Sequence, residues 1–334
     1  MKISDMHCDT IMSLMKNEDV HLFDGNRMIN IDKLNKGDYL LQCFAMFVMY
    51  KQEDISNYSP FKYCNQMIDR YYKEIEQCKD YISPALSYKD IENNILNNRL
   101  TSLLTIEEGG VLEGKIENLE HFYNRGVRMI CLTWNFNNEI AHPNIDYTNI
   151  SERTIEVPLN LTTPNTTEGL TDFGKEVIKR MNELGMVIDC SHASDKTFYD
   201  VVELSTKPIV CSHSCSRSIC NHVRNMSDDM LFKLKENGGV VGINYCHDFV
   251  KDDNSVVSIK DIVKHINYIK DLIGIDYIGL GSDFDGIEND NIELKDASMM
   301  PLLLNELRNQ GYSNDDIDKI TYKNVLRVFK ANNL

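Results

Sequence analysis

Side chains that bind metal ions recur directly after short apolar runs of this chain. The runs end in His7-Cys8-Asp9, Glu107-Glu108, Asp189-Cys190-Ser191-His192, Cys211-Ser212-His213 and Ser282-Asp283-Phe284-Asp285. Imidazole nitrogen and carboxylate oxygen are ligands that Zn²⁺ accepts in proteins. Because side chains alternate along an extended chain, His7 and Asp9 should point to the same side and could share one ion.

The same residues could hold two ions rather than one. Glu108 has two carboxylate oxygens and could bridge the ions, while His192 and His213 would complete the second. Three ligands per ion leave a position open for a bridging hydroxide, which is typical of a catalytic site. Glu107 is an alternative to Glu108 as the ligand, and Asp285 is an alternative to Asp283.

These residues need a fold that brings distant strand ends together. Eight apolar runs, most of them rich in Val, Ile and Leu, predict parallel strands covered on both faces. The runs are 2–8, 40–49, 102–107, 128–134, 186–191, 208–212, 239–245 and 277–282. Amphipathic stretches with helix-capping residues lie between them, at 87–100, 171–184, 227–236 and 258–272.

Repeated strand–helix units predict an α/β fold, a (β/α)8 TIM barrel of the metal-dependent hydrolase type. We expect a single catalytic domain over residues 1–334. The active site of such a barrel lies at the C-terminal ends of its strands, where the polar residues fall. The stretch 135–170 is polar and lacks periodicity, so we expect a loop on this face that could act as a lid.

Composition excludes several classes of partner. The chain of 334 residues has a formal net charge of −16, which argues against binding to nucleic acid or to anionic membrane surfaces. No apolar run is long enough to cross a membrane. The ten cysteines lack CxxC pairs, and we interpret them as reduced thiols of a cytoplasmic protein.

An ordered set of motifs spans nearly the whole chain. They are DMHCDT at 5–10, EEGG at 107–110, GVRMICLTWN at 126–135, GLTDFG at 169–174, GMVIDCSHAS at 185–194, PIVCSHSCSRSICNHVRN at 208–225, GLGSDFDG at 279–286 and NVLRVF at 324–329. In these motifs the chain resembles the membrane dipeptidase (renal dipeptidase) family of zinc peptidases, which is related to the amidohydrolase barrels. The resemblance implies hydrolysis of dipeptides, including those with a D-residue in second place, and a homodimer.

The resemblance also implies a role for each residue. His7 and Asp9 match ligands of the first of two zinc ions, and His192 and His213 match ligands of the second. Glu108, rather than Glu107, matches the bridging carboxylate.

Two further matches concern the reaction and the substrate. Asp283, rather than Asp285, matches the residue that handles the water and the leaving group, as general base and then acid. Arg224 matches an arginine near the substrate and could pair with the dipeptide carboxylate.

One residue departs from the family pattern. Many members have a histidine that contacts the substrate where this chain has Trp134. Tryptophan donates one N–H but carries no charge, so another donor could act there or the substrate range could differ. An enzyme acting on a different small amide or lactone is therefore an alternative. A catalytically silent metal-binding homologue is a further alternative, but no ligand is missing.

Overall fold

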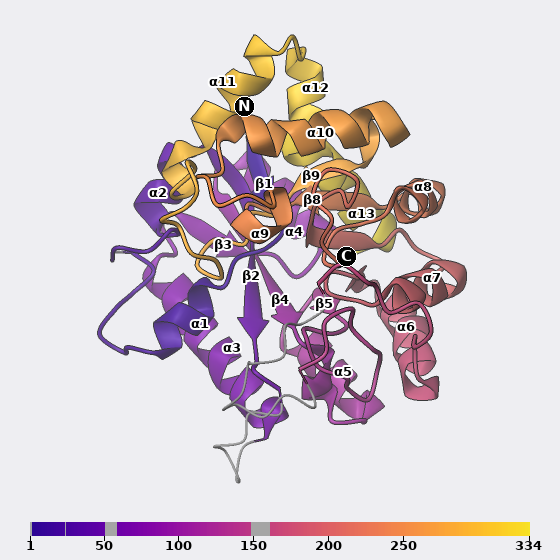
Figure 1. Ribbon diagram of the computed structural model, residues 1–334. Helices are drawn as coiled ribbons and strands as arrows, with labels where there is room; N and C mark the ends of the chain where they lie inside the picture. Colours follow the sequence, from indigo (N-terminus) through magenta and orange to yellow (C-terminus); the bar gives the residue numbers. More distant parts are fainter. Residues whose placement is uncertain (1, 24, 51–58, 148–160) are drawn as a thin grey trace.

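Eight parallel strands form a closed ring with helices around it, in a computed structural model that describes residues 2–23, 25–50, 59–147 and 161–334 (Figure 1). The ring strands are β1 (Ile3–Asp5), β2 (Tyr39–Phe47), β4 (Leu100–Glu107), β5 (Met129–Cys131), β6 (Val187–Asp189), β7 (Val210–Ser214), β8 (Val240–Ile243) and β9 (Ile278–Leu280). Pairing of β2 with β4 and of β1 with β9 closes the barrel. The predicted (β/α)8 TIM barrel is confirmed.

Each of the eight predicted apolar runs overlaps one barrel strand. An additional short strand, β3 (Ile82–Pro84), pairs with β4 and was not predicted. Several strands end earlier than the apolar runs do; β1, for example, ends at Asp5 rather than at residue 8. The chain leaves the regular ladder there, and the predicted ligands His7, Asp9 and His192 lie just beyond it, whereas His213 lies within β7.

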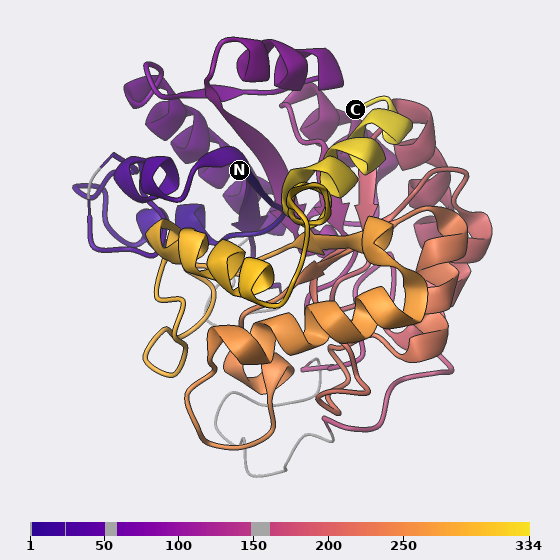
Figure 2. The same ribbon diagram turned by 90° about the horizontal axis from the view of Figure 1, so that it is seen from above.

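Helices cover the outside of the barrel (Figures 1 and 2). They are α1 (Thr10–Met15), α2 (Ile31–Lys36), α3 (Pro60–Gln77), α4 (Tyr88–Leu96), α5 (Ile116–Asn124), α6 (Asp172–Leu184), α7 (Asp195–Leu204), α8 (Asp228–Asn237), α9 (His247–Val250), α10 (Ile259–Ile273), α11 (Met300–Asn309), α12 (Asn314–Asp318) and α13 (Asn324–Asn332). The four helices predicted from their caps are present, and Ser258 forms a reciprocal capping box with Asp261.

Helix α13 covers the end of the barrel at which the strands begin (Figure 2). Its Asn332 donates to the carbonyl of Pro208, and Arg327 donates to that of Gly238; both acceptors precede a strand. Val325 and Phe329 pack with apolar side chains from inside the barrel. Because this end is filled, a substrate must enter at the C-terminal ends of the strands.

The predicted loop between β5 and α6 contains no helix or strand in its described parts, 135–147 and 161–170. Residues 148–160 lie outside the described residues, and a lid role stays a prediction. Within the described chain, no helix is both long and apolar enough to cross a membrane.

Candidate metal centre

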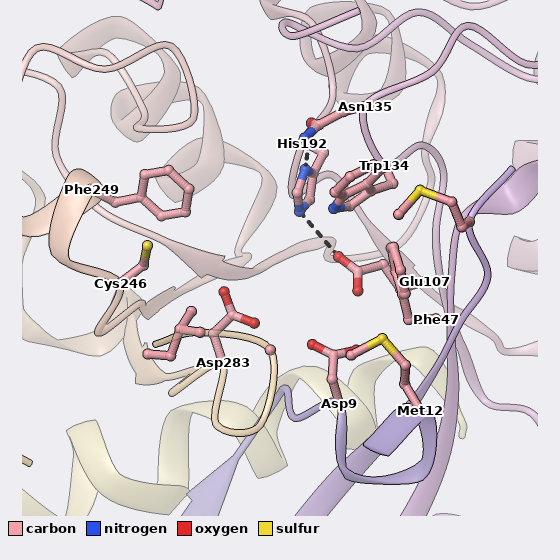
Figure 3. Close-up of a pocket in the computed structure, with 13 residues that line it drawn as sticks. Asp9, Met12, Phe47, Glu107, Trp134, Asn135, His192, Cys246, Phe249 and Asp283 are labelled. Atoms are coloured by element: carbon pink, nitrogen blue, oxygen red, sulfur yellow. Dashed lines mark hydrogen bonds and ion pairs between the residues drawn. The ribbon is translucent and has the colours of Figure 1, made fainter. Parts of the chain in front are cut away.

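Three histidines surround the carboxylate of Glu107 inside the barrel mouth. Its Oε1 lies 3.1 Å from Nε2 of His192 and 3.4 Å from Nε2 of His213. Its Oε2 lies 3.3 Å from Nε2 of His7. Figure 3 shows the carboxylate directed toward His192. Each oxygen of Glu107 therefore faces a different set of ligand atoms, as a carboxylate that bridges two cations would.

Two aspartates complete the side of the site that contains His7. Oδ2 of Asp9 lies 3.4 Å from Nε2 of His7, and Oδ1 of Asp283 lies 3.8 Å from the same nitrogen. Gly286 leaves room beside them, because a Cβ atom there would lie 2.1 Å from Oδ2 of Asp9 and 2.7 Å from Oδ1 of Asp283. Any larger residue at this position would obstruct the carboxylates.

Hydrogen bonds select which ring nitrogen of the second histidine pair faces Glu107. Nδ1 of His192 lies 2.9 Å from Oδ1 of Asn135, and Nδ1 of His213 lies 2.8 Å from the hydroxyl of Ser212. Their Nε2 atoms face each other at 3.1 Å. An Nδ1–H that donates outward leaves Nε2 with a lone pair, which is the form that binds a metal ion.

Burial and neighbouring charges set the protonation of the three histidines. Burial, with the charge of Arg224, lowers the pKa of His192 to about 3, and burial lowers the pKa of His213 well below its usual range. For His7, burial lowers the pKa, but the charges of Glu107 and Asp9 outweigh it and the net pKa is raised. Neutral His192 and His213 are ready to bind a cation without first losing a proton.

The residues present fit a divalent metal ion. Nε2 of His7 and Oδ1 of Asp9 are buried and have no hydrogen-bond partner among the described residues. Oxygen and nitrogen atoms of His7, Glu107 and His213, and likewise of His7, Asp9 and Asp283, lie within 4.8 Å of one another. Such a mixed imidazole and carboxylate donor set suits Zn²⁺ and also other first-row ions.

A cavity of about 250 Å³ opens beside these ligands. Apolar side chains form its walls: Trp134, Phe47 and Met49, and also Met12, Cys246, Phe249 and Ile287. Figure 3 shows Trp134 and Phe47 on one side of the carboxylates and Phe249 and Cys246 on the other. The site thus combines a polar floor with two apolar walls, and its size suits a small substrate.

The model of the membrane dipeptidase family, peptidase family M19, matches residues 1–334. The chain belongs to the membrane dipeptidase family. It is therefore an enzyme of a metallopeptidase family, a hydrolase acting on peptide bonds.

Similar proteins agree with this assignment. Dipeptidase aclJ from Aspergillus oryzae is 33% identical over 306 residues, which cover 90% of this chain and 69% of that protein. Human dipeptidase 3 is 32% identical over 239 residues, which cover 70% of this chain and 45% of that protein. A metallo peptidase from Rhodobacter sphaeroides, solved with a phosphinate mimic of the dipeptide L-Ala-D-Ala, has a TM-score of 0.87 at 20% identity, with 99% of both chains covered. That last likeness supports the barrel fold.

Glu108 does not lie where the sequence placed it. Its carboxylate accepts hydrogen bonds from the backbone N–H of Gly110 at 2.6 Å, from that of Trp134 at 3.0 Å and from Nδ2 of Asn138 at 2.5 Å. The backbone of Glu108 has a φ of 92° and turns away from β4, whose last residue is Glu107. The structure therefore contradicts the predicted bridging role of Glu108, and Glu107 is the carboxylate that lies among the three histidines.

The choice between the two aspartates after β9 has the opposite outcome. Asp283 lines the cavity and accepts a hydrogen bond from Nδ2 of Asn244 at 2.9 Å. Asp285 instead accepts from Oγ1 of Thr10 and the backbone N–H of Met28, each at 2.7 Å. Burial raises the pKa of Asp283 to about 7; His7 opposes this rise, and the nearby carboxylates add to it. The structure brings only Asp283 to the ligands.

The two predicted substrate residues differ in position. Trp134 lines the cavity, with its ring 5.1 Å from that of Phe47 in an edge-on contact. Arg224 is buried but does not line the cavity; its guanidinium lies 5.1 Å from the ring of Phe249, which does. Arg224 donates to the carbonyl of His213 at 3.1 Å. Among the described residues no carboxylate pairs with this buried cation.

Sequence reasoning missed the residues that hold the ligands in place. Asn135, Ser212 and Asn244 each contact a ligand or Asp283, and none of them was singled out. Amide and hydroxyl groups are common in loops, so their types carried no signal. Only their positions, next to predicted ligands or after a barrel strand, could have pointed to them.

Proposed function

We propose that this enzyme is a zinc dipeptidase with two metal ions, which hydrolyses the peptide bond of dipeptides, including L-D dipeptides. The observation that carries the proposal is Glu107, whose two oxygens face His7 on one side and His192 with His213 on the other. In this arrangement Asp9 and His7 would hold one ion, His192 and His213 would hold the other, and Glu107 would be shared by both. Two such ions would lower the pKa of a shared water toward ~7 and polarise the scissile carbonyl.

Asp283 is the group that moves protons in this proposal. It lies at the cavity surface beside His7, and Nδ2 of Asn244 fixes its Oδ2 at 2.9 Å. Its other oxygen, Oδ1, faces Nε2 of His7 at 3.8 Å and would take a proton from the attacking water and deliver it to the leaving amine. Both steps require the same carboxylate, and we assign this role to Asp283.

Arg224 supplies the positive charge that a dipeptide carboxylate requires. A buried guanidinium without an anionic partner is costly, and its Nε has no hydrogen-bond partner among the described residues. Phe249, which stacks with it, lines the cavity. We infer that the C-terminal carboxylate of the substrate completes the pairing when Phe249 shifts.

Replacing Arg224 with Gln should weaken dipeptide binding. Loss of a buried charge pair costs at least about 2 kcal/mol, so kcat/KM should fall about 30-fold or more. A dipeptide whose C-terminus is an amide should be a poor substrate of the wild type and should lose little further in the variant. An equal loss for both substrates would contradict the carboxylate assignment.

Trp134 should select for substrates with apolar side chains. Replacing it with Ala removes one wall of the cavity, so kcat/KM for Leu- or Phe-containing dipeptides should fall about tenfold, as expected for lost apolar contact of ~1.5 kcal/mol. Trp134→Phe should retain most of the rate, and Gly-Gly should respond least in both variants. A loss as large for Gly-Gly as for Phe-containing dipeptides would show that Trp134 acts on the reaction instead.

The proposed function is tested with a panel of L-L and L-D dipeptides. Protein stripped of metal should be inactive, and zinc should restore cleavage with two ions bound per chain. No cleavage across the panel, with two zinc ions bound, would overturn the dipeptidase proposal. It would favour the alternative of a different small amide or lactone, which the apolar walls around Trp134 would then select.

A further inference from the structure

Two junctions between neighbouring strands of the barrel, here called seams, contain few regular strand pairs. Within the named strands, β1 and β9 share one paired position, Asp5 with Leu280, and β6 and β7 share one, Asp189 with Val210. Every other neighbouring pair in the ring has at least three. One further bridge, Cys8 with Phe284, lies beyond the first seam. At both seams the paired residue is a buried aspartate.

Each of these aspartates connects the two strands of its seam through the same set of hydrogen bonds. Oδ1 of Asp5 accepts from the backbone N–H of His7 at 3.2 Å and of Ser282 at 2.9 Å, and its Oδ2 accepts from the Ser282 hydroxyl at 2.5 Å. The donors lie two residues after Asp5 and two residues after its strand partner, Leu280.

The second seam repeats this arrangement at equivalent positions. Oδ1 of Asp189 accepts from the backbone N–H of Ser191 and of Ser212, each at 2.9 Å, and its Oδ2 accepts from the Ser212 hydroxyl. Ser191 is two residues after Asp189, and Ser212 is two residues after its strand partner, Val210. All four side chains, Asp5, Ser282, Asp189 and Ser212, are at most 1% exposed, so water does not compete for these bonds.

The residues of the metal centre lie next to these hydrogen-bonded aspartates and serines in the sequence. The backbone of His7 is itself a donor to Asp5, and Asp283 comes immediately after Ser282. On the other side, His213 comes immediately after Ser212 and contacts its hydroxyl, and His192 is the third residue after Asp189. Each half of the centre therefore straddles one seam.

We propose that Asp5 with Ser282, and Asp189 with Ser212, are two equivalent positioning pairs, each of which sets the ligands of one metal ion. The inference rests on the proposed two-ion function. At each seam the aspartate, rather than a backbone carbonyl, accepts hydrogen bonds from N–H groups of both strand ends and so holds these ends at a fixed separation. Ser212 has an additional effect, because its hydroxyl donates to Asp189 and contacts Nδ1 of His213. It thus links the carboxylate to the histidine, as an outer partner of a metal-bound histidine does.

The test compares Ser212→Ala with Ser282→Ala, each of which removes the serine hydroxyl from one of the two positioning pairs. Zinc is titrated into metal-free protein against a competing chelator, and the number and affinity of bound ions are measured. Each variant should weaken one ion by roughly 10- to 100-fold and leave the other unchanged. The melting temperature of the metal-free protein shows that each variant is folded.

A second ligand variant shows which ion is affected. In a His192→Ala background, which lacks a ligand of the second ion, Ser212→Ala should cause no further loss, whereas Ser282→Ala should weaken the ion that remains. Ser212→Thr keeps the hydroxyl and should restore binding, and Asp189→Asn should reproduce the loss if Ser212→Ala does not fold.

Two outcomes separate the inference from the function on which it rests. Serine variants that weaken both ions equally, or neither, while the wild type binds two would overturn the positioning pairs. A wild type that binds only one ion would overturn the two-ion function itself.

Discussion

Replacing Glu107 with Gln should abolish both zinc binding and peptide hydrolysis. The amide keeps the size of the side chain but removes the charge that faces three histidines and offers only one oxygen as a ligand. Because Glu107 contacts both halves of the centre, the affinity for both ions should fall by more than the roughly 100-fold that loss of an outer partner costs. Zinc stoichiometry and dipeptidase rate, measured on the same preparation, check this.

Glu108→Gln is the matched control, one residue along the chain. The three donors to Glu108 are Gly110, Trp134 and Asn138, and none of them is a candidate ligand. The variant should therefore keep two zinc ions, with its main effect on substrate range through Trp134. Loss of zinc from Glu108→Gln, with Glu107→Gln unaffected, would restore the assignment that the sequence motif suggested.

Asp283→Asn should separate catalysis from metal binding. If Asp283 moves the proton between water and leaving group, its loss should lower kcat by about 10²- to 10⁴-fold, the usual contribution of general acid–base catalysis. Zinc stoichiometry should stay at two, because the proposed ligands His7, Asp9 and Glu107 would still hold the first ion. Steady-state kinetics with one dipeptide, together with metal analysis, checks both parts.

Asp285→Asn is the control for that prediction. Asp285 accepts hydrogen bonds from Thr10 and Met28 and does not line the cavity, so its replacement should alter stability rather than kcat. Full activity in Asp283→Asn would contradict the proton-transfer role. A comparable loss of kcat in Asp285→Asn would show that the loop after β9, rather than one carboxylate, is what matters.

Most barrel strands could be predicted because they are apolar on both faces. A run such as Ile278–Leu280 contacts the barrel interior on one side and helices on the other, so its composition alone shows that it is a covered parallel strand. The strand β3 could not be found this way. Its three residues include Pro84 and lie at the edge of β4, with little apolar content to mark them.

The candidate ligands that the structure brings together could be predicted as a set, except that Glu108 was chosen in place of its neighbour Glu107. In β4, Leu103 packs inside the barrel, whereas Leu104 and Ile106 pack with the outer core. Alternation from Leu103 places Glu107 inside and leaves Glu108 beyond the strand end. The signal was present in the sequence, because the predicted run 102–107 ends where β4 ends; the match to the family motif, not the alternation, selected Glu108.

The supporting residues depend on contacts that no local pattern encodes. Asp5 and Ser282 are far apart in sequence and meet only because β1 pairs with β9. Arg224 is a second example. Its motif predicts a substrate contact, but its stacking with Phe249 depends on tertiary packing that the motif does not encode. The cytoplasmic location and the homodimer stay predictions.

The most direct test of the central claim is anomalous X-ray diffraction at the zinc edge from crystals of the zinc-loaded protein. Two peaks are expected about 3.5–4 Å apart, as in other two-metal sites, with the carboxylate of Glu107 between them. One of these ions should lie beside His7 and Asp9, and the other beside His192 and His213. A single peak, or a peak beside Glu108, would contradict it.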